Sequence, residues 1–190
     1  MHRRASVALV VATLTVLTAA CTDDPETTTT TTGPRSSTTA QELTPDPRLA
    51  AEREAIQALK DYTDLENTVA KAGFKDYFQL IDLVTSDYGK TYGEQLYSFQ
   101  QSGVRQVGDA TLSDFKVIDH HTVESELYDD QLSVEVCIDN SKVDLLYPDG
   151  TSVMQTEAKG RWVTTVTLWH RTGTQWWYVA GYLMDGGRPC

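Results

Sequence analysis

Hydrophobic residues between positions 48 and 103 recur every three and four residues, which is typical of amphipathic helices. Asp46 before Pro47 predicts an N-cap and a first helical position, and Gly73 predicts the C-terminal end of that helix. A short second helix is expected over 74–81 and a third over 86–103. The apolar stripe of the first helix consists of Ile56, Leu59, Tyr62, Leu65, Val69 and Ala72.

After Gly103 the hydrophobic period changes from about four residues to two. Between 132 and 139, apolar residues alternate with polar ones, which predicts a half-buried antiparallel strand. Further strand regions are expected over 104–117, 143–145, 153–169 and 175–184, with turns at 148–150 and 172–174. Three helices followed by a meander predict an α+β fold, with helices packed on one face of a curved antiparallel sheet.

Residues 1–21 differ from the rest of the chain. Arg3 and Arg4 precede an apolar stretch of sixteen residues, which would span about 24 Å as a helix and is too short for a bilayer core. Ala19 and Ala20 then precede Cys21. The segment resembles a bacterial lipoprotein signal peptide, which implies that Cys21 carries acyl groups such as palmitate at the outer face of the cell membrane. The alternative is an ordinary secretory signal cleaved near Ala20.

Residues 22–47 contain ten Thr and four Pro and no aromatic residue. Such a composition buries too little apolar surface to offset the entropy of folding, so we expect a disordered stalk. It would be either a bare spacer or a carrier of O-linked sugars. The folded domain is therefore expected over 48–190.

The net charge of −11 excludes some functions. A nucleic-acid-binding protein needs a basic surface to meet phosphates, and adhesion to anionic lipid has the same requirement. No nucleic-acid partner is expected, and a lipid anchor rather than charge would hold the chain at a membrane.

The part of the chain from 48 to 190 resembles a known fold family. The resemblance is carried by segments 103–105, 136–141 and 161–168, by the Asp149-Gly150 turn, and by a final hairpin with Trp177 and Val179. With these features the chain resembles actinobacterial lipoproteins that have an NTF2-like domain, which is a cone-shaped, cystatin-like α+β fold. That fold hosts enzymes, ligand binders and adaptors, so it implies little about function.

Cys137 and Cys190 remain after Cys21 is assigned. Cysteines of an exported protein usually pair, and the resemblance implies a disulfide between these two. Two free thiols are the alternative. Neither cysteine has another Cys or His at metal-ligand spacing, so no metal site is expected.

The sequence contains none of the common catalytic motifs. His120 and His121 are adjacent near a strand end and fit a hairpin turn, and His170 fits a solvated strand end. Asp129-Asp130 reads as a solvated turn. Since no Asp/His pair matches the acid and base of cone-fold enzymes, we expect no catalytic residues and no cofactor.

Four aromatic residues are candidates for lining an apolar pocket on the concave side of the sheet, although ordinary core packing is the favoured explanation for them. We expect a noncatalytic binding or scaffolding module for a small apolar ligand or an envelope protein. A small cone-fold enzyme, isomerase-like or hydratase-like, and a structural envelope protein are the alternatives. The candidate pocket residues are Tyr62, Phe78, Trp162 and Trp177.

Overall fold

A computed structural model of the protein describes residues 46–154 and 158–190. The predicted signal peptide, with Cys21, and the predicted stalk up to residue 45 lie outside these residues. Within the described ranges, no helix is both long enough and apolar enough to cross a membrane.

Helix α1 spans Pro47–Lys71 and begins as the sequence predicts. The Asp46 side chain accepts a hydrogen bond from the Arg48 backbone amide at 3.0 Å, and Pro47 occupies the first turn, where its missing N–H does no harm. Gly73 follows the helix with a φ of +74°, a conformation that turns the chain sharply and that residues with a Cβ rarely adopt. The chain then reverses into α2 (Phe78–Ile81) and α3 (Ser86–Gln101).

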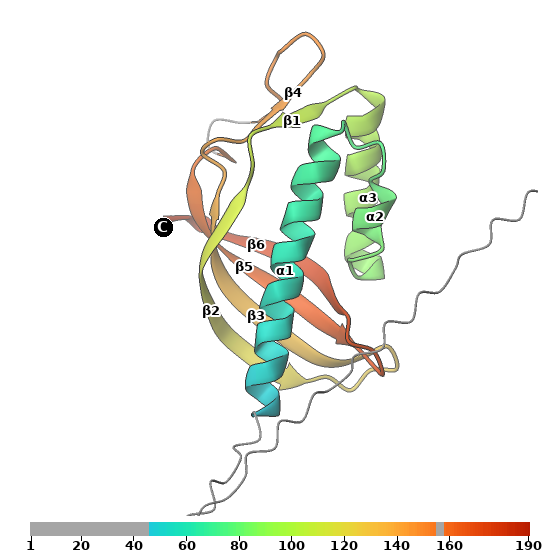
Figure 1. Ribbon diagram of the computed structural model, residues 1–190, viewed down its shortest axis with the longest axis vertical. Coiled ribbons are helices and arrows are strands. Elements are labelled where there is room, and N and C mark those ends of the chain that lie inside the picture. The colour runs from blue at the N-terminus through green and yellow to red at the C-terminus, as the bar shows by residue number, and fades with distance from the viewer. Residues whose placement is uncertain (1–45, 155–157) are drawn as a thin grey trace, which may run out of the picture. The chain divides into compact units, whose positions relative to one another are not determined.

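Four long strands form one antiparallel sheet in the order β2-β3-β5-β6. Their bounds are Thr111–Thr122 for β2, Tyr128–Asp139 for β3, Arg161–Arg171 for β5 and Trp177–Pro189 for β6. Two short strands, β1 (Arg105–Val107) and β4 (Asp144–Leu146), pair separately beyond one end of that sheet. Figure 1 shows α1 and α3 on the same side of the curved sheet. The predicted α+β class, with helices packed on an antiparallel sheet, is confirmed.

The core lies between α1 and the sheet. Leu59 and Tyr62 of α1 meet the inward-facing residues of β3 and β5, among them Leu132, Val134 and Val166, all of which are almost fully buried. Apolar burial on this scale is the main force that holds helices and sheet together.

A disulfide joins Cys137 in β3 to Cys190, with 5.9 Å between the two Cα atoms. It holds the end of β6 beside β5, where Pro189 pairs with Trp162 and the Cys190 amide donates to the Arg161 carbonyl at 3.3 Å. The bond thus secures the last strand at the end of the sheet that faces β1 and β4.

Two predicted elements are shorter in the structure. The strand expected over 153–169 begins only at Arg161, because Gly160 takes a φ of +142° and breaks the extended backbone before it. The second helix, expected over 74–81, is reduced to the single turn of α2, because Phe74 adopts a φ of +57° directly after Gly73.

Candidate functional site

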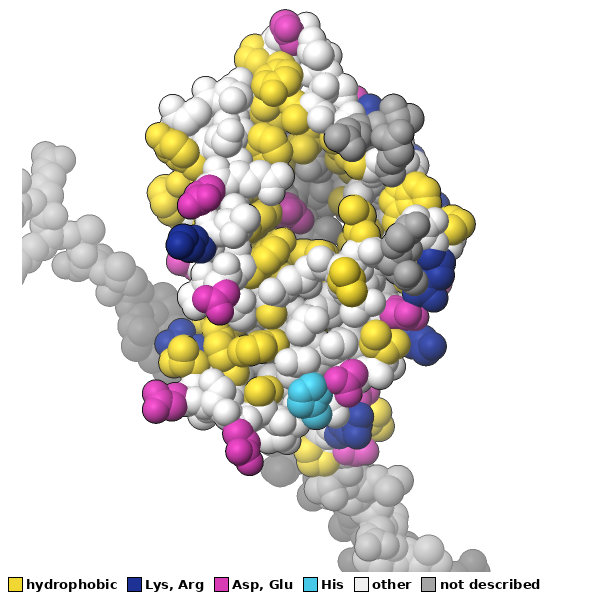
Figure 2. Space-filling model, turned by 180° about the vertical axis from the view of Figure 1, so that it is seen from behind, with side chains coloured by type: hydrophobic (Ala, Val, Ile, Leu, Met, Phe, Trp, Pro, Cys, Tyr) yellow, Lys and Arg dark blue, Asp and Glu magenta, His cyan; other side chains and the backbone are white. Residues whose placement is uncertain are grey.

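A cavity of about 400 Å³ opens where the β1–β4 pair and the adjacent end of the main sheet meet α1 and α3. Figure 2 shows a hollow ringed by hydrophobic side chains, with an acidic group inside it. Its lining comes from almost every element of the fold: Thr63, Glu66, Asn67, Tyr88, Gln106, Ala110, Leu112, Ile138, Asn140, Val143, Leu145, Met154, Trp162, Thr164, Tyr182 and Met184.

Strand register explains the sheet side of this lining. Leu112 pairs with Ile138, and Ile138 pairs with Trp162, so these three side chains lie next to one another on one face. Thr164, two residues after Trp162, points to the same face and pairs with Met184 of β6. Alternation along each strand therefore builds one continuous wall across four strands.

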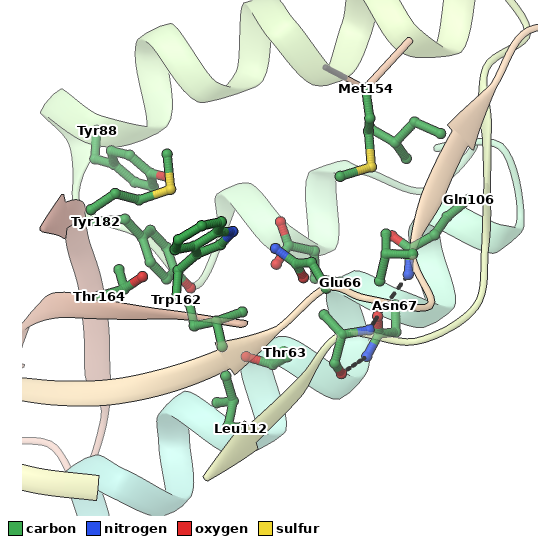
Figure 3. A pocket seen from close by; sticks show the side chains of 16 residues that line it. Thr63, Glu66, Asn67, Tyr88, Gln106, Leu112, Met154, Trp162, Thr164 and Tyr182 are labelled. Carbon is green, nitrogen blue, oxygen red and sulfur yellow. Dashed lines mark hydrogen bonds between the residues drawn. The ribbon is translucent and has the colours of Figure 1, made fainter. Parts of the chain in front are cut away.

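Glycine at position 160 leaves room for one part of that wall. A Cβ on Gly160 would lie 3.1 Å from the indole nitrogen of Trp162, a tight contact on a backbone that already has a positive φ. The indole nitrogen of Trp162 is buried and has no hydrogen-bond partner among the described residues. In Figure 3 it is turned toward the side of the cavity where Glu66 lies.

Helix α1 supplies the opposite wall, with Thr63, Glu66 and Asn67 on one face because they are three and four residues apart. Glu66 is half-buried and lines the cavity. Its Oε1 accepts a hydrogen bond from the Tyr92 hydroxyl of α3 at 2.5 Å. Burial raises the pKa of the Glu66 carboxyl, while the Tyr92 hydrogen bond opposes this in part.

Four tyrosines surround this carboxyl group. Burial, together with the negative charge of Glu66, raises the pKa of Tyr88 to about 12. The same two causes raise the pKa values of Tyr62, Tyr92 and Tyr182 further. All four phenols are therefore neutral hydrogen-bonding groups at physiological pH, and their rings exclude water from one side of Glu66.

Two amides fix the edge of the cavity between α1 and β1. Asn67 Oδ1 accepts from Gln106 Nε2 at 2.7 Å and from the Ala110 amide at 2.9 Å, and Asn67 Nδ2 donates to the Ala110 carbonyl at 2.9 Å. Gln106 Nε2 also donates to the Gly108 carbonyl at 3.1 Å. Figure 3 draws Asn67 and Gln106 side by side at this edge. The pair locks the helix to the segment that enters β2.

Of the predicted pocket residues, Trp162 lines the cavity. Tyr62 does not line the cavity but is buried in the core, and its hydroxyl makes no hydrogen bond among the described residues. Phe78 does not line it: the side chain is 64% exposed and stacks on Tyr77 on the outer side of α2. Trp177 belongs to the core between α1 and the far end of the sheet, where its ring lies 5.1 Å from that of His170.

Sequence reasoning missed Glu66, the acidic residue of the lining. A signal was present, because Glu66 stands four residues after Tyr62 and three before Val69 and therefore occupies a position of the buried stripe. A carboxylate at such a position indicates either a partner across the interface or a cavity.

The far end of the sheet holds a second group of polar residues. His120 of β2 lies 3.2 Å from Glu52 of α1 and 2.7 Å from Asp130 of β3, and His170 lies 2.7 Å from Asp129. The expected solvated turn at 129–130 and the expected hairpin turn at His120 are thus wrong, because both segments belong to the paired strands β2 and β3. His170 ends its strand half-buried rather than fully solvated.

These contacts fasten the start of α1 to the sheet. Burial alone would lower the pKa of His120, but its hydrogen bonds to Asp130 and Glu52 outweigh burial and raise it. Among the described residues, no cluster of three or more His, Cys, Asp or Glu side chains could hold a metal ion.

Comparison with known proteins assigns neither a family nor a function to this chain. No family model and no curated protein matches the chain. Among solved structures, the intermembrane space region of the chloroplast protein ARC6 is similar at 11% identity and a TM-score of 0.41, covering 70% of this chain and 94% of that one. A similarity this distant supports no statement about function.

Proposed function

We propose that residues 46–190 form a noncatalytic binding module for a small, largely apolar molecule, which occupies the cavity around Glu66. The observation that carries this proposal is the cavity itself, with a volume of about 400 Å³. Most of its lining is aliphatic, Met or aromatic, and its polar members are Thr63, Glu66, Asn67, Gln106, Asn140 and Thr164. Ligand sites in proteins have this size and this composition. A polar end of the ligand would meet Glu66, and its apolar body would lie against Leu112, Ile138 and Met184.

We propose in addition that the module is displayed outside the cell, as an NTF2-like lipoprotein anchored through Cys21. The apolar segment before Cys21 and the Thr-rich segment after it support this proposal. The Cys137–Cys190 bond supports it too, because structural disulfides belong to oxidising compartments.

The experiment compares two substitutions in the purified full-length protein. Ala110→Trp places an indole into the cavity, whereas Thr111→Trp adds the same bulk at the next, exposed position of the chain. Native mass spectrometry of protein recovered from its own host should find a bound small molecule on the wild type and on Thr111→Trp but not on Ala110→Trp. Equal occupancy of the two variants would contradict the assignment of the cavity as the binding site.

A small cone-fold enzyme of the isomerase or hydratase type is the second candidate. The observation in its favour is Glu66, because a carboxyl group in a cavity, with a raised pKa and a tyrosine partner, is suited to exchange a proton with a bound molecule. Conversion of the recovered molecule by the wild type, and its loss in Glu66→Gln with binding retained, would establish this activity. Binding without turnover would exclude it for that molecule.

A further inference from the structure

The polar groups of the cavity also indicate which kind of small molecule would fit, an inference that rests on the proposed binding function. We propose that the ligand is an apolar molecule with one cationic amine, whose ammonium group pairs with the Glu66 carboxylate. The body of the molecule would carry no further charge.

The cavity lining, as far as the structure describes it, holds no positive charge to balance the Glu66 carboxylate. No Lys, Arg or His belongs to the described lining of the cavity, and Glu66 is its acidic member. Among the described residues, Glu66 accepts a side-chain hydrogen bond from the neutral Tyr92 hydroxyl and none from a cation. A partly buried carboxylate with no cation beside it is costly, so a cationic ligand that pairs with it would relieve part of that cost.

The second argument concerns the groups that face Glu66 from each surrounding element. They are Tyr62 of α1, Tyr88 and Tyr92 of α3, and Tyr182 of β6. None of them can carry a positive charge. In the neighbouring amide pair, Gln106 Nε2 donates to Asn67 Oδ1 and to the Gly108 carbonyl, and Asn67 Nδ2 donates to the Ala110 carbonyl. Both amides are neutral, so they cannot replace a cation.

Aromatic rings give the third argument. Tyr88, Tyr182 and Trp162 all line the cavity, and in Figure 3 they lie on the same side of Glu66. The electron-rich faces of such rings attract ammonium groups, and more strongly where water is excluded. A carboxylate flanked by aromatic rings suits an amine better than a neutral or an anionic group.

The protein as a whole favours the same sign of ligand. Its net charge of −11 produces a negative potential that raises the local concentration of cations and lowers that of anions. A neutral apolar molecule would gain nothing from this charge.

The experiment uses three probes of similar shape: 2-phenylethylamine, 2-phenylethanol and 3-phenylpropionate. Isothermal titration of the full-length protein at pH 8 should give an affinity for the amine about tenfold or more above that for the alcohol, and weaker binding still for the carboxylate. In Glu66→Gln, which keeps the shape but removes the charge, the amine should lose its advantage over the alcohol. Tyr92→Phe should retain the preference, and melting curves verify that both variants fold.

Proton exchange provides an independent readout. Because the carboxyl pKa is raised, part of Glu66 is protonated below that pKa, and an arriving ammonium group would displace the proton. The affinity for the amine should therefore rise with pH, and the heat of binding below that pKa should differ between phosphate and Tris buffers, which take up protons with different enthalpies.

The outcomes separate this inference from the function on which it rests. If the alcohol binds as tightly as the amine, or if Glu66→Gln keeps the preference, the amine proposal is overturned while binding in the cavity stands. If none of the probes binds, the amine proposal is overturned too, and the comparison of Ala110→Trp with Thr111→Trp decides the binding function separately.

Discussion

Removal of the disulfide should strongly destabilise the fold. The bond closes a loop with a sequence separation of 53 residues, from Cys137 near the end of β3 to Cys190. The loss of chain entropy that such a loop imposes on the unfolded state corresponds to about 4 kcal/mol at 25 °C. This is a large fraction of the 5 to 15 kcal/mol by which domains are usually stable.

Urea denaturation followed by tryptophan fluorescence would measure the effect in the oxidised wild type, the reduced wild type and the Cys137→Ser/Cys190→Ser double variant. With a slope of about 2 kcal/mol per molar urea, the midpoint should fall by about 2 M in the last two samples. The reduced wild type and the double variant should agree, since both lack the bond.

A loss below about 1 kcal/mol would refute this reasoning. It would mean that the end of β6 is already confined in the denatured ensemble, or that the native bond is strained enough to cancel its benefit. A loss accompanied by a changed slope would instead point to a different denatured state, because the slope follows the surface exposed on unfolding.

Three further changes test other parts of the structure. Glu66 has a raised pKa in the folded protein, so its contribution to stability is present below pH 4.5 and is lost as the pH rises through the folded pKa. Glu66→Gln should therefore flatten the pH dependence of the melting temperature in that pH window. The pKa of His120 is also raised, so its stabilising effect is present below pH 6.5 and is lost as the pH rises through the folded pKa. His120→Gln should therefore remove a gain in stability on acidification. The control His121→Gln, at an exposed site, should leave that gain intact. Asn67→Ala removes two hydrogen bonds from α1 to Ala110, just before β2, and one to Gln106 of β1. It should lower the free energy of unfolding by about 2 to 3 kcal/mol in chemical denaturation, whereas Thr68→Ala, on the exposed side of the helix, should cost less than 1 kcal/mol.

Local patterns predicted the helices and the fold class because they depend on neighbouring residues. The cap at Asp46, the turn at Gly73 and the alternation from Leu132 to Ile138 all appear where expected. The cavity could not be predicted in the same way. Trp162 lines it only because β3 sets the register between β2 and β5.

The same dependence on contacts between distant parts of the chain explains why some predictions from the sequence were wrong. Asp129 and Asp130 look like a turn in isolation, and only pairing with β2 and β5 brings them to His120 and His170. Glu66 was overlooked because Leu65 next to it satisfies the helical period nearly as well. Phe78 fits the helical spacing of Phe74, Tyr77 and Ile81, but α2 turns the side of Leu80 into the core, and Phe78, two residues earlier, points away from it.

The cavity is lined by residues from most elements of the fold, so binding of a ligand is coupled to folding of the whole domain. Residues from Thr63 to Met184 contribute to one wall or another, so no fragment that lacks α1 or β6 can contain a complete site. A ligand would therefore stabilise only the completely folded domain, by about 2.7 kcal/mol at a free concentration one hundred times its dissociation constant. Resistance of the whole domain to heat or to proteases would then report the presence of the natural ligand before that ligand is identified.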